Sequence, residues 1–128
     1  RKKKIALRTS AYVEHWKQKR PKRLSFDISP KKGIDAPTEE TLTFRNRYPE
    51  IYIFAVLSEK DLRKIDVLDL EQWDFYVVRT ETLDEHHETT KKLGIRALQK
   101  LASPVHHSKL KDILDAIIEY DLGERLVL

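Results

Sequence analysis

Cysteine and methionine are both absent from the 128 residues, and glycine occurs only three times. Without cysteine there is no disulfide framework and no thiolate metal site, which fits a reducing compartment. The glycine-rich patterns of nucleotide-binding loops and the G-x-S-x-G turn of hydrolases are missing too. These absences leave nucleotide-binding and serine-hydrolase functions without a motif to support them.

Long apolar stretches are also lacking. The apolar run Ile51–Leu57 has seven residues, whereas a membrane-spanning helix needs about 20. The N-terminus is charged without a following apolar segment, so it does not have the pattern of a signal peptide. We therefore expect a cytoplasmic protein with no membrane partner.

The chain opens on Arg1, directly before a strand-like run, and contains no start methionine. We expect the native polypeptide to extend upstream of Arg1, so that an N-terminal part of the fold precedes this sequence.

Charge is distributed unevenly along the chain. Charged residues make up 36% of the sequence, well above the usual quarter. The first 32 residues hold twelve Lys and Arg against two acids, a net charge of +10, and the remainder has thirteen bases against nineteen acids, a net charge of −6. A concentrated basic segment in an otherwise acidic protein is typical of an anionic partner, most often nucleic acid.

The run Ile51–Leu57 predicts the central strand of the fold. It is rich in β-branched and aromatic residues and is bounded by Pro49 and a charged cluster, as in a strand buried on both faces. The run Asp74–Arg79 predicts a second strand beside it. We expect one α/β domain over residues 1–128, with a basic N-terminal part (1–32), a sheet core (50–79) and a helical C-terminal part (80–122).

The remaining elements are predicted from local patterns. Residues 4–9 and 23–28 alternate as strands, the latter with Leu24, Phe26 and Ile28 facing inward. Residues 10–20 have the spacing of a helix ended by Pro21, residues 31–46 read as a loop with one strand at 41–44, and residues 60–72 as a turn-rich connection. Residues 95–102 read as a short strand or turn that runs into a helical turn.

Two further helices are predicted from capping residues. Thr80 is placed to cap a short helix from Glu81 to about His86, with acids near its positive end. Ser108 is placed to cap a tail helix that Gly123 ends. The apolar residues of the tail helix follow the spacing of one buried face, and they are Leu110, Ile113, Leu114, Ile117 and Ile118.

The basic segment supplies the candidate nucleic-acid contacts. Cations interleaved with aromatic residues suit phosphate contacts combined with stacking. The candidates are Arg8, Lys17, Lys19, Arg20, Lys22 and Arg23, with Tyr12 and Trp16. The alternative is a solvated charged face, with Tyr12 and Trp16 in the core.

Two histidine pairs, His86-His87 and His106-His107, raise the question of a metal site. Adjacent side chains point in different directions on a helix or strand, and no nearby spacing completes a tetrahedral set. We therefore predict no metal site there, and the acids between Glu81 and Glu88 are interpreted as a solvated face at a helix N-terminus.

Three segments together resemble uncharacterised bacterial proteins associated with restriction systems, of the PD-(D/E)XK or restriction-endonuclease-like nuclease superfamily. They are residues 5–12 with Trp16, residues 51–57 with Glu59-Lys60-Asp61, and residues 67–78. The resemblance implies an α/β fold with a central mixed β-sheet flanked by helices, truncated at its N-terminus. It also implies double-stranded DNA as the partner and, since active enzymes of this fold commonly work as dimers, a homodimer.

The resemblance departs from the superfamily at the catalytic motif. In that superfamily an Asp and an acid-x-Lys hold Mg²⁺ and orient the attacking water. The acid-x-Lys falls here on Ala6-Leu7-Arg8, and the Asp falls before Arg1. Ala6 cannot bind a metal, and the guanidinium of Arg8 does not give up its proton at working pH.

Two hypotheses follow for function. The first is a DNA-binding domain of nuclease fold whose metal-dependent site is substituted or incomplete, with Mg²⁺ as cofactor only if cleavage is retained. The second is a non-enzymatic protein-interaction module, in which the basic N-terminal segment binds an acidic partner or the chain's own acidic half from Glu59 to Glu88.

Overall fold

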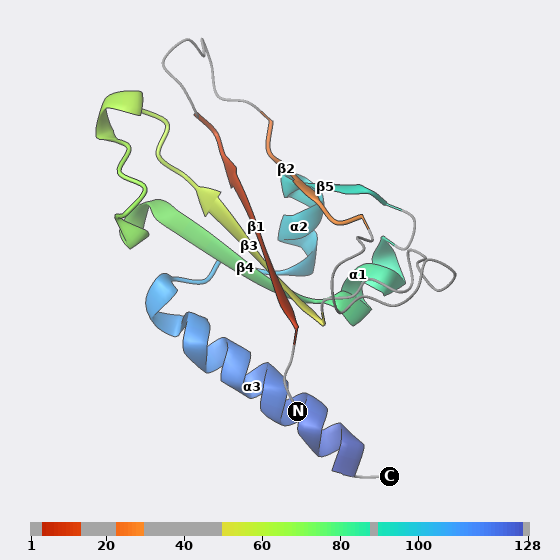
Figure 1. Ribbon diagram of the computed structural model, residues 1–128. Coiled ribbons are helices and arrows are strands. Elements are labelled where there is room, and N and C mark those ends of the chain that lie inside the picture. The colour runs from red at the N-terminus through yellow and green to blue at the C-terminus, as the bar shows by residue number, and fades with distance from the viewer. Residues whose placement is uncertain (1–3, 14–22, 30–49, 88–89, 127–128) are drawn as a thin grey trace.

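The computed structural model describes residues 4–13, 23–29, 50–87 and 90–126 (Figure 1). Five strands, two 3-10 turns and three helices are found in these residues. In chain order they are β1 (Ile5–Ala11), β2 (Ser25–Asp27), β3 (Ile51–Leu57), η3 (Leu62–Lys64), η4 (Leu70–Gln72), β4 (Trp73–Arg79), α1 (Thr80–His86), β5 (Lys92–Gly94), α2 (Ile95–Leu101) and α3 (His107–Leu126). The chain is thus an α/β protein with a small mixed sheet, as predicted.

The strand β3 is the centre of the main sheet. It lies between β1, which runs parallel to it, and β4, which runs antiparallel. All seven of its residues are buried, which confirms the prediction of a strand covered on both faces. The register pairs Tyr52 with Ala6 on one side and with Val78 on the other, so these three side chains lie on the same face of the sheet.

A second, two-stranded sheet packs against that face. The strands β2 and β5 pair antiparallel, with Phe26 opposite Leu93. Leu24, Phe26 and Ile28 are all buried, as their alternation predicted. The ring of Phe26 meets that of Phe54 edge-on, with centroids 5.0 Å apart, and this contact joins the two sheets.

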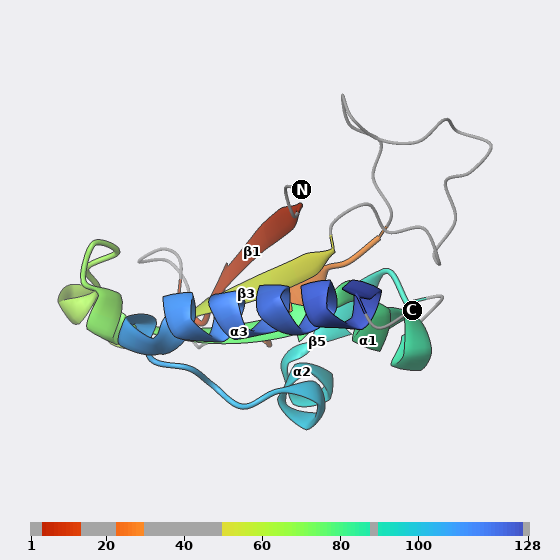
Figure 2. The same cartoon turned by 90° about the horizontal axis from the view of Figure 1, so that it is seen from below.

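The helices cover the sheets from different sides. Leu83 of α1 and Leu98 of α2 are fully buried in the core shared with β2 and β5. The long helix α3 lies apart from them and runs alongside β4 (Figures 1 and 2). The guanidinium carbon of Arg79 on β4 lies 5.5 Å from the ring centroid of Tyr120 on α3.

The apolar face predicted for the tail helix is only half-buried. Its five members, Leu110, Ile113, Leu114, Ile117 and Ile118, are all of intermediate exposure. The helix also continues through Gly123 to Leu126, so the predicted stop at Gly123 is wrong. A glycine ends a helix when it takes a left-handed conformation, and no glycine among the described residues has a positive φ angle.

Three other boundaries differ from the predictions. Ser10 and Ala11 belong to β1 and not to a helix, because hydrogen bonding to β3 extends that strand to its full length. Thr80 is the first residue of α1 and is buried, so its side chain is not the cap. Ile95–Leu101 forms a helix from its first residue, directly after β5.

The faces of β1 do not follow hydrophobicity. Ala6 is buried, whereas Ile5 and Leu7 are 45% and 57% exposed. The predicted loop at 31–46, its strand at 41–44 and most of the predicted helix at 10–20 lie outside the described residues.

Candidate functional site

Ala6 and Arg8, the positions to which the resemblance assigns the acid and the Lys, lie on the same face of β1. Ala6 belongs to the main hydrophobic cluster. The Nε of Arg8, two residues further on the same face, donates to the carbonyl oxygen of Asp27 at 3.1 Å. The guanidinium carbon of Arg8 lies 5.6 Å from the ring centroid of Tyr52. Arg8 thus links β1 to β2 and the core, besides carrying a positive charge.

Of the other candidate nucleic-acid contacts in the basic segment, Tyr12 and Arg23 belong to the described residues. Tyr12 is half-buried against the core cluster, with the Lys60 ammonium nitrogen 4.5 Å from its ring centroid. Arg23 is exposed directly before the buried Leu24. Lys17, Lys19, Arg20, Lys22 and Trp16 lie outside the described residues.

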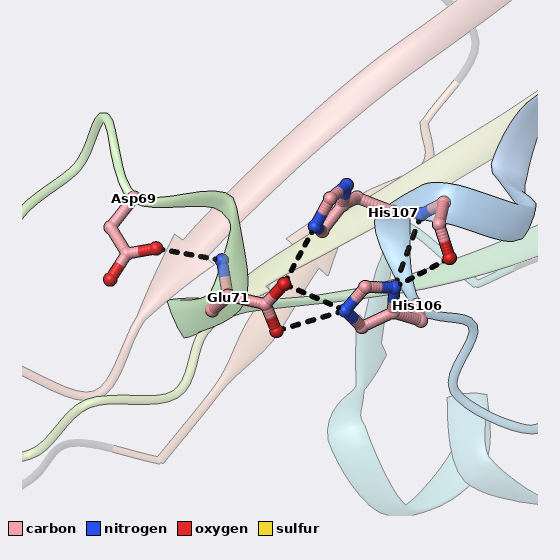
Figure 3. A network of polar contacts seen from close by, with 5 residues as sticks. Asp69, Glu71, His106 and His107 are labelled. Atoms are coloured by element: carbon pink, nitrogen blue, oxygen red, sulfur yellow. Dashed lines mark hydrogen bonds and ion pairs between the residues drawn. The ribbon is translucent and has the colours of Figure 1, made fainter.

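A second group of polar side chains converges where η4 meets the start of α3 (Figure 3). The Nε2 of His106 lies 3.0 Å and 2.9 Å from the two carboxylate oxygens of Glu71. The Nε2 of His107 lies 2.9 Å from Glu71 Oε1. The two imidazole rings are 4.1 Å apart between centroids, so both rings face one carboxylate.

Local structure brings these residues together from distant parts of the chain. The carboxylate of Asp69 caps η4 by accepting the backbone N–H of Glu71 at 3.0 Å. On the other side, Val105 forms an isolated β-bridge with Phe75 of β4, through hydrogen bonds of 2.7 Å and 3.2 Å. Because Val105 directly precedes His106, this bridge fixes both histidines beside the turn that carries Glu71.

The connection that carries Glu71 is itself held by hydrogen bonds. The side chain of Gln72 accepts the backbone N–H of Asp66 at 2.9 Å and donates to the carbonyl of Lys64 at 2.8 Å. The indole N–H of Trp73 donates to the carbonyl of Val67 at 3.1 Å. These bonds tie the loop between β3 and β4 back onto itself, so that η4 has a defined position.

The histidines act on the charge of Glu71. The hydrogen bond from His106, followed by that from His107, holds the pKa of Glu71 below its ordinary value of 4.5, because both stabilise the ionised carboxylate. The side chains of Glu71, His106 and His107 are 66%, 49% and 30% exposed. The carboxylate of Glu71 is therefore ionised at neutral pH, and all three side chains are accessible to solvent.

One hydroxyl completes the surroundings of His106. Its Nδ1 lies 2.8 Å from the hydroxyl oxygen of Ser108 and accepts the backbone N–H of Ser108 at 3.2 Å. The side chain of His106, and not that of Ser108, thus bonds a backbone N–H at the start of α3. The predicted capping role of Ser108 is replaced by a contact with the histidine.

The prediction that adjacent histidine side chains point apart is wrong for this pair. His106 lies just before α3 and His107 is its first residue, and both rings turn toward Glu71. The third member lies 35 residues away from His106, so no local spacing indicates it. Of the residues with defined positions, Glu71, His106 and His107 form the one set of three or more potential metal ligands; His86 and His87 belong to none.

Glu71 also lines an open depression on the surface. Its volume is about 430 Å³ and its other lining residues are Ser58, Glu59, Lys60 and Gln72. The site at the start of α3 is therefore next to a concave, mainly polar surface.

Comparisons with known proteins add no family. No family model, no curated protein and no solved structure matches the chain. In the described part of the chain, no helix has the length and apolar character needed to cross a membrane.

Proposed function

We propose that this chain is a duplex-DNA-binding domain of restriction-endonuclease-like fold, whose metal-dependent nuclease site is substituted at Ala6 and Arg8. The observation that carries the proposal is the charge distribution, a net +10 in the first 32 residues against −6 in the rest. A segment of this charge attracts the phosphate backbone regardless of sequence.

Features of the fold agree with this proposal at a coarse level. A mixed sheet flanked by helices is the architecture that the resemblance implies. Ala6 offers no oxygen or nitrogen ligand from its side chain, and the core surrounds it. Arg8 donates to a backbone carbonyl of β2 and lies over the ring of Tyr52. Its guanidinium therefore stabilises the contact between β1 and β2, and we propose that its charge also attracts an anionic partner.

The proposed DNA contacts come from the segment between two anchored points. The chain is buried at Val13 and again at Leu24, and the cations lie between or beside these residues in the sequence. We assign phosphate contacts to Lys17, Lys19, Arg20, Lys22 and Arg23, and stacking or apolar contacts to Tyr12 and Trp16. Each phosphate neutralised steepens the dependence of log affinity on log salt by about 0.9.

The experiment measures binding to a labelled duplex at two or more salt concentrations. In the triple variant Lys17→Ala, Lys19→Ala, Arg20→Ala we expect weaker binding to all sequences alike and a salt slope shallower by roughly 2.7, because three phosphate contacts are lost. Unchanged affinity and slope would refute the assignment. Incubation of the duplex with Mg²⁺ tests the substituted site, since cleavage would place a working metal site elsewhere in the protein.

A matched control separates a local contact from an effect of net charge. Lys64, Lys100 and Lys109 are exposed cations outside the basic segment, and their replacement by Ala removes the same three charges. We expect this control to retain the salt slope of the unmodified chain. An equal loss of DNA affinity in both triple variants would mean that binding depends only on the overall charge of the chain.

The second candidate is the protein-interaction module, and one feature favours it. Val67, Leu68 and Leu70, on the connection between β3 and β4, are 58%, 87% and 49% exposed. Exposed apolar residues close together often mark contact surfaces. Self-association in sedimentation experiments, together with no affinity for DNA at low salt, would support this function over DNA binding.

A further inference from the structure

We propose that Glu71, His106 and His107 form a binding site for a divalent transition-metal ion, with Zn²⁺ as the best-suited ion. The site would join the turn η4 to the first turn of α3. It does not rest on the DNA-binding proposal, because none of its residues belongs to the basic segment.

The donor set indicates this class of ion. Two imidazole nitrogens and one carboxylate are ligands that Zn²⁺ commonly takes, whereas Mg²⁺ and Ca²⁺ prefer oxygen alone. Three protein ligands leave a fourth position for water or another ligand, and the solvent exposure of all three side chains leaves room for it.

The distances are close to those that a bound ion requires. The ligand atoms all lie within 4.8 Å of one another, and zinc bonds of about 2.0–2.1 Å in tetrahedral geometry place ligands roughly 3.4 Å apart. The Glu71–histidine separations of 2.9–3.0 Å need to open by only a few tenths of an ångström. Ligand atoms near the 4.8 Å limit would have to close by about 1.4 Å.

Metal binding would change the hydrogen bonds of His106 on the side away from Glu71. For Nε2 of His106 to bind an ion, the ring proton must sit on Nδ1. In the structure Nδ1 accepts the backbone N–H of Ser108 at 3.2 Å, so metal binding requires the other tautomer. That backbone hydrogen bond is then given up, and Nδ1–H donates to the hydroxyl oxygen of Ser108, 2.8 Å away, as to a partner that orients a metal-binding histidine. The β-bridge between Phe75 and Val105 holds the backbone before His106 whether or not an ion is bound.

The same contacts have a simpler interpretation that the experiment must exclude. Without a metal, each Nε2–H donates to Glu71, and the three side chains form a hydrogen-bonded tie between η4 and α3. This tie needs protons on the ring nitrogens that a metal would occupy. A tie alone would give no stoichiometric affinity for Zn²⁺.

The test uses the untagged chain and Zn²⁺ in competition with a chromogenic chelator. We expect one ion per chain, a raised thermal midpoint on binding, and, with Co²⁺ as a probe, the strong visible absorption of a four-coordinate site. His106→Gln and Glu71→Gln should each weaken binding by about tenfold or more, and Ser108→Ala by about tenfold. Circular dichroism of each variant without metal checks that the fold is retained.

His86→Gln is the matched control, since His86 belongs to the other histidine pair and is exposed. It should leave affinity and the Co²⁺ spectrum unchanged. Absence of stoichiometric binding, or equal binding by the chain and by the His106→Gln and Glu71→Gln variants, would overturn the proposal. A loss with His86→Gln as large as that with His106→Gln would likewise refute the site.

Discussion

Replacing Phe54 by alanine tests the contact that joins the two sheets. Phe54 is fully buried, meets Phe26 edge-on at 5.0 Å and stacks on Tyr52 at 5.6 Å. Removal of a buried phenylalanine ring costs about 3–5 kcal/mol, and the loss of two aromatic contacts places the expected cost near the middle, at about 4 kcal/mol. Such a loss is a large share of the about 5–15 kcal/mol that stabilises a typical domain.

The assay is urea unfolding followed by circular dichroism. With a slope of about 1–3 kcal/mol per M, a loss of about 4 kcal/mol lowers the midpoint by roughly 1.3–4 M. Leu68→Ala is the control, because Leu68 is 87% exposed and its removal should change stability by no more than about 0.5 kcal/mol. If Phe54→Ala is unfolded without denaturant, Phe54→Leu gives a smaller loss that can be measured.

A double-mutant cycle then isolates the contact between the sheets. Phe26→Ala, Phe54→Ala and the double variant should show a coupling energy of about 0.5–1.5 kcal/mol. A loss below about 1 kcal/mol for Phe54→Ala, or coupling near zero, would mean that β2 does not pack on β3 as described.

Three further outcomes are expected. The stability gained from Glu71 should be fully present above pH 4.5 and be lost as the pH falls below it, because a lowered folded-state pKa favours the folded protein only while the carboxylate is ionised. The difference in unfolding free energy between the unmodified chain and Glu71→Gln should therefore become smaller as the pH falls below 4.5. A difference that stays constant with pH would contradict this. Gln72→Ala removes the hydrogen bonds to Asp66 and Lys64, so amide hydrogen exchange in the connection between β3 and β4 should accelerate while β3 stays protected. Gly123→Ala should raise stability by about 0.5–1 kcal/mol, because Gly123 lies within α3; a loss of stability would contradict a helix that continues through this residue.

Local patterns determined most of the strands. The apolar run from Ile51 to Leu57 predicted a strand buried on both faces, and the alternation of Leu24, Phe26 and Ile28 predicted which side of β2 faces the core. The first succeeds because a strand covered on both faces has apolar residues at every position, and the second because a strand with one buried face has a side-chain period of two residues. The charge asymmetry is likewise a property of the sequence and needs no structure.

Tertiary structure decided what local patterns could not contain. Ala6 is buried and Leu7 exposed on β1, against their hydrophobicity, because the faces of that strand are set by its register with β3 and by β2. The strongest case is the meeting of Glu71 with His106 and His107. It depends on a capped turn, on the course of β4 and on a single β-bridge at Val105, and hence on contacts between segments that no spacing in the sequence records.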